Sequence, residues 1–102
     1  MTYDNAITAL ADPTRRAVFE ALAVKPQSVA DLAQGQPVSR PAVSQHLKVL
    51  VGARLVKATP QGTRRIYALD PTGLIALRAY LDRFWDDTLG AYAAEVRRQS
   101  AN

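Results

Sequence analysis

Apolar residues recur every three or four positions through the first half of the chain, which is the spacing of helices that bury one face. The sequence therefore predicts four helices there, over residues 3–11, 13–23, 28–35 and 39–51. The fourth, SRPAVSQHLKVLV, is expected to turn one face inward, made by Val43, Leu47, Leu50 and Val51. Its other face is polar and is left for solvent or for a partner.

Short polar residues and glycines indicate where these helices begin and end. Asp12, Ser28 and Ser39 each precede a helical segment, and their side chains can accept hydrogen bonds from first-turn N–H groups. Gly35 and Gly52 are predicted to end the third and fourth helices.

The helical spacing of apolar residues ends after residue 53, where β-branched and aromatic residues become frequent. Residues 55–59 and 64–69 are predicted to form two short strands, and the sequence TPQGT from Thr59 has the composition of a turn between them. Asp70 and Pro71 then repeat the cap-and-proline signal of a helix start. A long amphipathic helix is predicted to follow over residues 71–99.

The predicted order is four helices, a two-stranded β-hairpin and a fifth helix, a mainly α fold. The third and fourth helices, joined by a tight turn, predict a helix-turn-helix over about residues 28–52. The hairpin that follows, over about residues 55–69, predicts a wing. The length of 102 residues and the hydrophobic content of 48% fit a single winged helix-turn-helix domain over residues 1–102.

The residue types present exclude several kinds of site. The chain has no cysteine, which removes disulfides, thiolate metal ligands and cysteine nucleophiles. Because His46 is its one histidine, a zinc or copper site would have to rest on carboxylates, and neither a metal nor a cofactor is expected. No apolar run approaches the roughly 18–20 residues of a membrane span. We expect a cytoplasmic protein that does not enter membranes.

Positive charge is concentrated in one part of the chain. Between Leu32 and Leu69 there is no Asp or Glu, while the same interval holds six Lys and Arg residues. The remaining seven basic and nine acidic residues leave the rest of the chain slightly negative. A block of one sign points to an anionic partner, since solvated surfaces usually mix charges.

The polar face of the helix at 39–51 lies within this block. Pro41, Ser44, Gln45 and Lys48 recur at helical spacing, and Arg40 stands at the exposed start. Glutamine can pair with adenine, serine with several bases, and Arg or Lys with guanine, so this face is expected to contact double-stranded DNA in the major groove. The alternative is a merely solvated face, which would normally include acids paired with lysine.

The tip of the predicted wing has similar chemistry. Gln61, Gly62 and Thr63 form a polar, flexible tip, and Arg64 and Arg65 follow it. Such a tip suits contact with the DNA backbone or minor groove, and the alternative is an ordinary charged hairpin. Adjacent residues of a strand point to opposite faces, so only one of the two arginines is expected to reach outward fully.

The final helix has a wider apolar stripe than a small core requires. We expect this stripe to form a two-fold interface with the first helix of a second copy, although all its residues could also be internal. The dimerisation helices are then those over about residues 3–11 and 71–99. The expected interface residues are Ile7, Leu10, Leu77, Leu81, Phe84, Trp85 and Tyr92.

Three further basic residues are expected to serve the scaffold. His46 lies between the two faces of its helix and is interpreted as a hydrogen-bonded boundary residue. Arg15 and Arg16 follow Asp12 on an early helix, and a local salt bridge or packing of their stems is preferred to DNA contact.

An enzyme is not expected, because the chain has no glycine-rich phosphate loop and no nucleophile–histidine–acid set. The rival from another class is a winged helix that docks on a protein without binding specific DNA. That module would favour an apolar helix face, and the acid-free polar block argues against it.

Taken together, the motifs resemble the ArsR-type winged helix-turn-helix transcriptional regulators over nearly the whole chain. The resemblance rests on ALADPTRRAVFEAL, SVADLA, VSRPAVSQHLKVL, ARLVKATPQGTRRIYALD and LRAYLDRFWDD. It implies a homodimer of five helices and a two-stranded wing that represses transcription by binding an operator. The family's recognition-helix contacts fall here on Ser39, Arg40, Ser44, Gln45 and Lys48, and its wing contacts on residues 61–65.

Many members of this family sense metals through cysteines near the helix-turn-helix or through His and acidic ligands on the last helix. This chain has Val29, Ala30 and Leu32 at the first surface and no histidine on the last helix. It therefore resembles the branch that does not sense metals, and we expect an effector of another kind.

Overall fold

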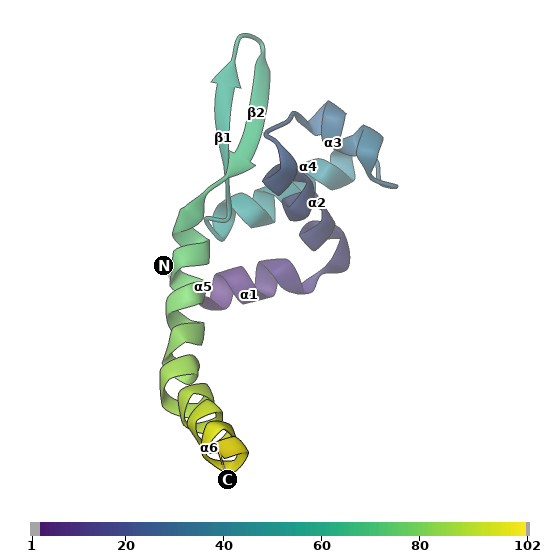
Figure 1. The fold of residues 1–102 in the computed structure, drawn as a ribbon. Helices are drawn as coiled ribbons and strands as arrows, with labels where there is room; N and C mark the ends of the chain where they lie inside the picture. The colour runs from purple at the N-terminus through teal and green to yellow at the C-terminus, as the bar shows by residue number, and fades with distance from the viewer. Residues whose placement is uncertain (1–2, 102) are drawn as a thin grey trace.

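The computed structural model describes residues 3–101, in which the fold is mainly α with a two-stranded hairpin, as predicted. Figure 1 shows α1 to α4 gathered into a body, the hairpin projecting from it, and a long helical arm running to the C-terminus. The elements in chain order are α1 (Tyr3–Ala11), α2 (Pro13–Val24), α3 (Val29–Gly35), α4 (Arg40–Gly52), β1 (Val56–Gln61), β2 (Arg64–Leu69), α5 (Pro71–Phe84), η1 (Trp85–Leu89) and α6 (Gly90–Ala101).

The predicted helix over 71–99 is three consecutive segments, so the described residues contain one α-helix more than expected. α5 ends at Phe84, a π-helical segment follows as η1, and α6 begins at Gly90. The Gly90 N–H donates to the carbonyl of Trp85, five residues back, which is the π spacing. The apolar repeat alone carries no signal for this single wider turn, which explains why the sequence predicts one unbroken helix.

All four predicted N-caps are confirmed. Each cap side chain accepts a hydrogen bond from a backbone N–H in the first turn of its helix, which stabilises that end. The donor–acceptor distances are 2.9 Å for Asp12 with Arg15, 3.2 Å for Ser28 with Asp31, 3.3 Å for Ser39 with Ala42 and 3.0 Å for Asp70 with Thr72.

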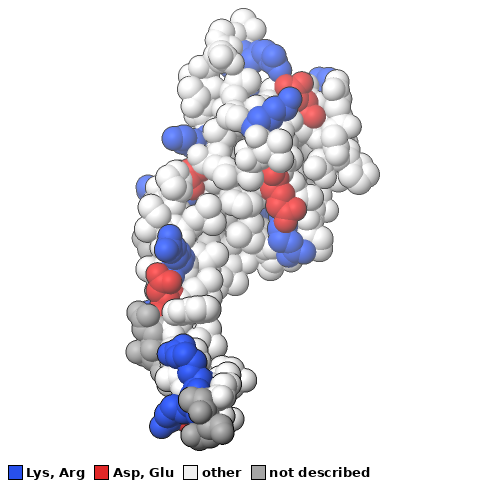
Figure 2. Space-filling model, in the orientation of Figure 1, with Lys and Arg blue, Asp and Glu red and all other residues white. Residues whose placement is uncertain are grey.

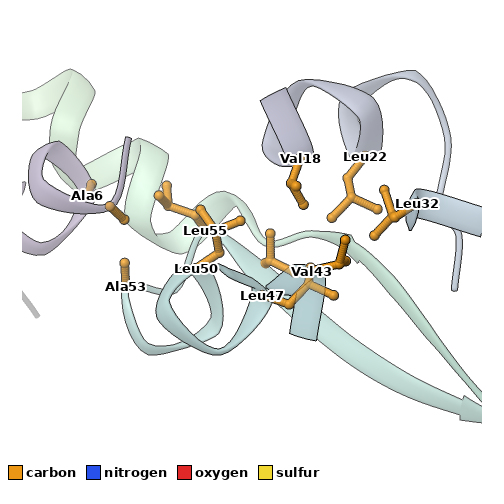
Figure 3. Close-up of a cluster of buried hydrophobic side chains, with 11 residues drawn as sticks. Ala6, Val18, Leu22, Leu32, Val43, Leu47, Leu50, Ala53 and Leu55 are labelled. Atoms are coloured by element: carbon orange, nitrogen blue, oxygen red, sulfur yellow. The ribbon is translucent and has the colours of Figure 1, made fainter. Parts of the chain in front are cut away.

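The core lies between α1, α2, α3, α4 and the start of the hairpin (Figure 3). Its largest fully buried side chains are Leu32, Leu47, Leu50, Leu55, Val18, Val43 and Val56. Three of the four residues predicted on the inner face of α4 are therefore buried. Val51 is the exception and is 40% exposed, because the helix has turned that position toward the wing.

The turn that ends α4 is a Schellman motif with an unusual residue. The N–H of Leu55 donates to the carbonyl of Leu50 and the N–H of Arg54 to that of Val51, both at 3.0 Å. Arg54 takes the left-handed conformation, with φ at 58°, which such motifs normally give to glycine. α4 ends at Gly52, as predicted, and the left-handed residue of the turn is Arg54, two positions later.

The two strands pair antiparallel from Val56 with Leu69 to Gln61 with Arg64. The hairpin loop is only Gly62 and Thr63, with Gly62 at φ 65°, so the predicted five-residue turn is too long. Pro60 lies within β1, which is tolerated because β1 is an edge strand.

β2 has a second backbone neighbour on its other side. Gln27, in the link between α2 and α3, exchanges two hydrogen bonds with Tyr67, of 3.1 and 2.9 Å. The base of the wing is therefore attached to the helix-turn-helix by backbone contacts as well as by the chain itself.

α5 begins in direct backbone contact with the turn after α4. The Gly73 N–H donates to the carbonyl of Arg54 at 2.8 Å. A Cβ added at Gly73 would lie 2.6 Å from the Ala53 carbonyl oxygen and 2.9 Å from that of Arg54. Only glycine allows this approach, so Gly73 sets where the helical arm leaves the body.

We predict that Gly73→Ala destabilises the protein by about 1–3 kcal/mol, the usual cost of forcing atoms into a filled space. Gly52→Ala is the matched control, because a Cβ there meets no atom within 4 Å. Chemical denaturation should show the control neutral or slightly stabilised, since alanine favours a helix. Equal stability of the two variants would contradict the close contact at Gly73.

Candidate nucleic-acid interface

The outward edge of α4 carries the recognition-helix residues that the sequence predicts. All six are exposed: Ser39, Arg40, Pro41, Ser44, Gln45 and Lys48. The opposite side of the helix is held in the core, so packing sets the rotation of α4 about its axis. The helix has no acidic residue, and the exposed edge is therefore free of any carboxylate of its own.

The tip of the wing carries the other predicted contacts. Gln61, Thr63, Arg64 and Arg65 are all exposed, and they surround the two-residue loop. Figure 1 shows this tip at the end of the molecule opposite the C-terminus.

A hollow of about 360 Å³ joins α4 to the wing. Its walls are Ser44, Lys48 and Val51 from α4 and Ala58, Arg65 and Tyr67 from the hairpin. Two basic side chains from different elements thus line one depression together with apolar and aromatic residues. We call it the α4–wing hollow; it makes the helix edge and the wing one continuous surface.

Arg64 points to the other side of β2. Its Nη2 donates to Ser28 Oγ at 2.8 Å and to Asp31 Oδ2 at 3.1 Å, both on α3 or its cap. The two wing arginines therefore face different neighbours, as strand geometry predicts. In this structure Arg64 is bonded within the protein, whereas Arg65 lines the α4–wing hollow.

Ser28 and Asp31 are the site residues that sequence reasoning missed. The hydrogen bond with Ser28, followed by the charge of Arg64, holds the pKa of the Asp31 carboxyl below its ordinary value, outweighing partial desolvation. The carboxylate is thus charged at neutral pH. The only signal in the sequence was Asp31 standing directly before the acid-free block, and nothing local indicates a partner 33 residues away.

The three basic residues assigned to the scaffold lie in or on it. His46 is half-buried and near Asp12, whose pKa is lowered mainly by the Arg15 backbone N–H and partly by His46. Arg15 and Arg16 donate to the carbonyls of Thr8, Ala9 and Leu10 that end α1. Among the described residues neither forms the predicted salt bridge; both cap a neighbouring helix instead.

Large apolar side chains remain exposed along the helical arm and on α1. Of the seven residues predicted at a dimer interface, five are exposed: Ile7, Leu81, Phe84, Trp85 and Tyr92. The other two, Leu10 and Leu77, are partly buried against the core of their own chain. Packing within one chain therefore leaves most of this stripe uncovered.

Two other kinds of site are absent from the part of the chain that the structure describes. No group of three or more His, Asp or Glu side chains there could hold a metal ion. No helix within the same residues is long and apolar enough to cross a membrane.

Comparison with known families and curated proteins places this surface in context. Residues 10–58 match a helix-turn-helix domain family. The chain is 64% identical over 90 residues to the HTH-type transcriptional regulator Rv2034 of Mycobacterium tuberculosis, covering 88% of this chain and 84% of that protein. It is 31% identical over 71 residues to the transcriptional repressor SdpR of Bacillus subtilis, covering 70% and 79%.

Solved structures agree with this relationship. An ArsR-like transcriptional regulator from Rhodococcus sp. RHA1 superposes with a TM-score of 0.76 at 31% identity, covering 88% of each chain. The homodimeric winged helix-turn-helix DNA-binding domain of Mb0332 from Mycobacterium bovis, a possible ArsR-family regulator, gives 0.66 at 26% identity, covering 84% of this chain and 80% of that one. The chain belongs to the ArsR-type winged helix-turn-helix transcriptional regulators.

Proposed function

We propose that this regulator is a homodimeric repressor that binds a short imperfect palindrome in double-stranded DNA. The observation that carries the proposal is the α4–wing hollow, where Ser44 and Lys48 of α4 meet Arg65 of β2. Two separate elements thereby offer one basic surface beside an acid-free helix edge. The domain boundaries that we propose are the helix-turn-helix at about 28–52 and the wing at about 55–69.

Within α4, we assign base reading to Arg40, Ser44 and Gln45, which lie at or near its N-terminal end. A recognition helix presents this end to the major groove, where glutamine can pair with adenine and arginine with guanine. Ser39 and Pro41 frame the helix start, whose backbone N–H groups suit a phosphate.

Phosphate contact is assigned to residues with longer or more distant side chains. Lys48 and Arg65 line the hollow from opposite walls and can neutralise backbone charge there. Gln61 and Thr63 at the wing tip can donate hydrogen bonds to phosphate or reach the minor groove.

Dimerisation is assigned to α1 and the helical arm. The exposed apolar stripe through Leu81, Phe84 and Trp85 needs a covering surface, and a second copy supplies one by two-fold symmetry. The homodimeric state of the Mb0332 domain supports this assignment. Two recognition helices would then reach major grooves about one helical turn apart.

Release from DNA is assigned to an effector other than a metal ion, because cysteine is absent and His46 is the one histidine.

We place the protein in the cytoplasm, where bacterial regulators meet DNA. The rival proposal, a winged helix that docks on a protein, is less well supported because the exposed edge of α4 is polar and acid-free. We propose no enzymatic activity.

We predict that Gln45→Ala weakens binding to a duplex selected by the wild-type protein from a random library by about ten- to a hundredfold, because a bidentate base contact contributes about 1–3 kcal/mol of discrimination. Binding to unselected random duplex should stay unchanged. Gln99→Ala, at the far end of α6, is the control. Fluorescence anisotropy at two salt concentrations measures the affinity for the selected and the random duplex. If Gln45→Ala lost the same affinity on both duplexes, Gln45 would not read a base.

We predict that Leu81→Glu converts the protein from dimer to monomer, because a charge would be buried in the apolar interface. Leu81 is 55% exposed in the single chain, so the fold should survive. Val24→Glu is the control, since Val24 is more exposed and lies on α2. Sedimentation equilibrium gives the mass. A dimer that persists in Leu81→Glu would rule out this face as the interface.

A further inference from the structure

The wing needs support that its own two strands do not supply. An isolated two-stranded hairpin is marginally stable in water, and the loop end is the first part to open. The backbone bridge between Gln27 and Tyr67 holds the base of β2. Arg64 lies three residues nearer the loop, in the last strand pair before it, with Gln61.

The side chain of Arg64 bonds to the start of α3 at this loop end. One nitrogen, Nη2, reaches both Ser28 Oγ and Asp31 Oδ2. Ser28 is only 6% exposed and also caps α3, so the anchor is fixed by the helix itself. Figure 2 shows an acidic group flanked by basic groups at the level where the wing adjoins α3 in Figure 1.

This arrangement has two consequences for the DNA-facing surface. It fixes the angle between the wing and the helix-turn-helix, on which the meeting of Arg65 and Lys48 in the α4–wing hollow depends. It also pairs the negative charge of Asp31, which directly precedes the acid-free interval, with a positive charge of the wing.

We propose that Arg64 is a positioning residue: held by Ser28 and Asp31, it braces the wing tip against α3, while Arg65 makes the phosphate contact of the arginine pair. The DNA part of this inference rests on the proposed function; the brace itself does not. Exposed ion pairs add little to global stability, so its effect is on the local order of the wing.

The decisive variant is Arg64→Gln combined with Asp31→Asn, which removes the brace and leaves the net charge unchanged. In the DNA-free protein, amide hydrogen exchange at the loop end of β1 and β2 should quicken about two- to fivefold, the range set by one exposed pair. Arg64→Gln alone should show the full change, because it removes both contacts, and Asp31→Asn alone a smaller one, because the bond to Ser28 remains. A double variant with the two charges swapped, Arg64→Asp with Asp31→Arg, should restore part of the protection against amide hydrogen exchange.

Titration of random duplex over a range of salt separates positioning from direct contact. The double variant should bind about two- to fivefold more weakly with an unaltered salt dependence, whereas Arg65→Gln should lower the slope of log affinity against log salt by about one. A slope lowered by about one in the double variant, or unchanged exchange at the wing tip, would overturn the proposal. If the wild-type protein shows no salt-dependent binding, the proposed function fails while the exchange experiment still tests the brace.

Discussion

The turn between α4 and β1 holds together α4, the base of the wing and the start of the helical arm. Leu50 and Leu55 are both fully buried, and the N–H of Leu55 donates to the carbonyl of Leu50 across the turn. The same contact therefore ends the recognition helix and begins the wing. Because both leucines are in the core, the end of α4 and the base of the wing are held at a fixed place relative to each other.

The helical arm begins at the same turn. The N–H of Asp70 donates to the carbonyl of Leu55, and Gly73 approaches the carbonyl of Arg54 more closely than any side chain would allow. The surface assigned to dimerisation is thus attached through backbone hydrogen bonds to the residues that place α4 and the wing. In a dimer, such an attachment would carry the spacing of the two arms directly into the spacing of the two recognition helices.

Local chemistry explains which parts of this structure could be predicted from the sequence. A cap residue acts within its own first turn, so Asp12, Ser28, Ser39 and Asp70 indicated four helix starts without knowledge of the fold. The left-handed turn at Arg54 was not predictable, because buried neighbours hold an arginine where glycine is usual. The π-helical segment at Trp85–Leu89 was missed because an apolar stripe looks the same across one wider turn.

The candidate site was predictable from its exposed residues, but its charge balance was not. The acid-free interval of the sequence does not stay acid-free in space: Arg64 meets Asp31, which lies just outside it. At the other end of the wing, the backbone N–H of Thr72 and then the charges of Lys57 and Arg54 hold the pKa of Asp70 low.

Two carboxylates at the borders of that interval therefore offset part of its positive charge. Asp31 forms an ion pair with Arg64, and Asp70 interacts with Lys57 and Arg54 only through longer-range charge effects. Among the described residues, Arg64 alone of the six has an ion-pair partner. Three of those without one are Arg40, Lys48 and Arg65. They lie at the start of α4 and on the walls of the α4–wing hollow. Folding thus offsets positive charge at the two borders of the block and leaves Arg40, Lys48 and Arg65 on the surface that we propose for DNA contact.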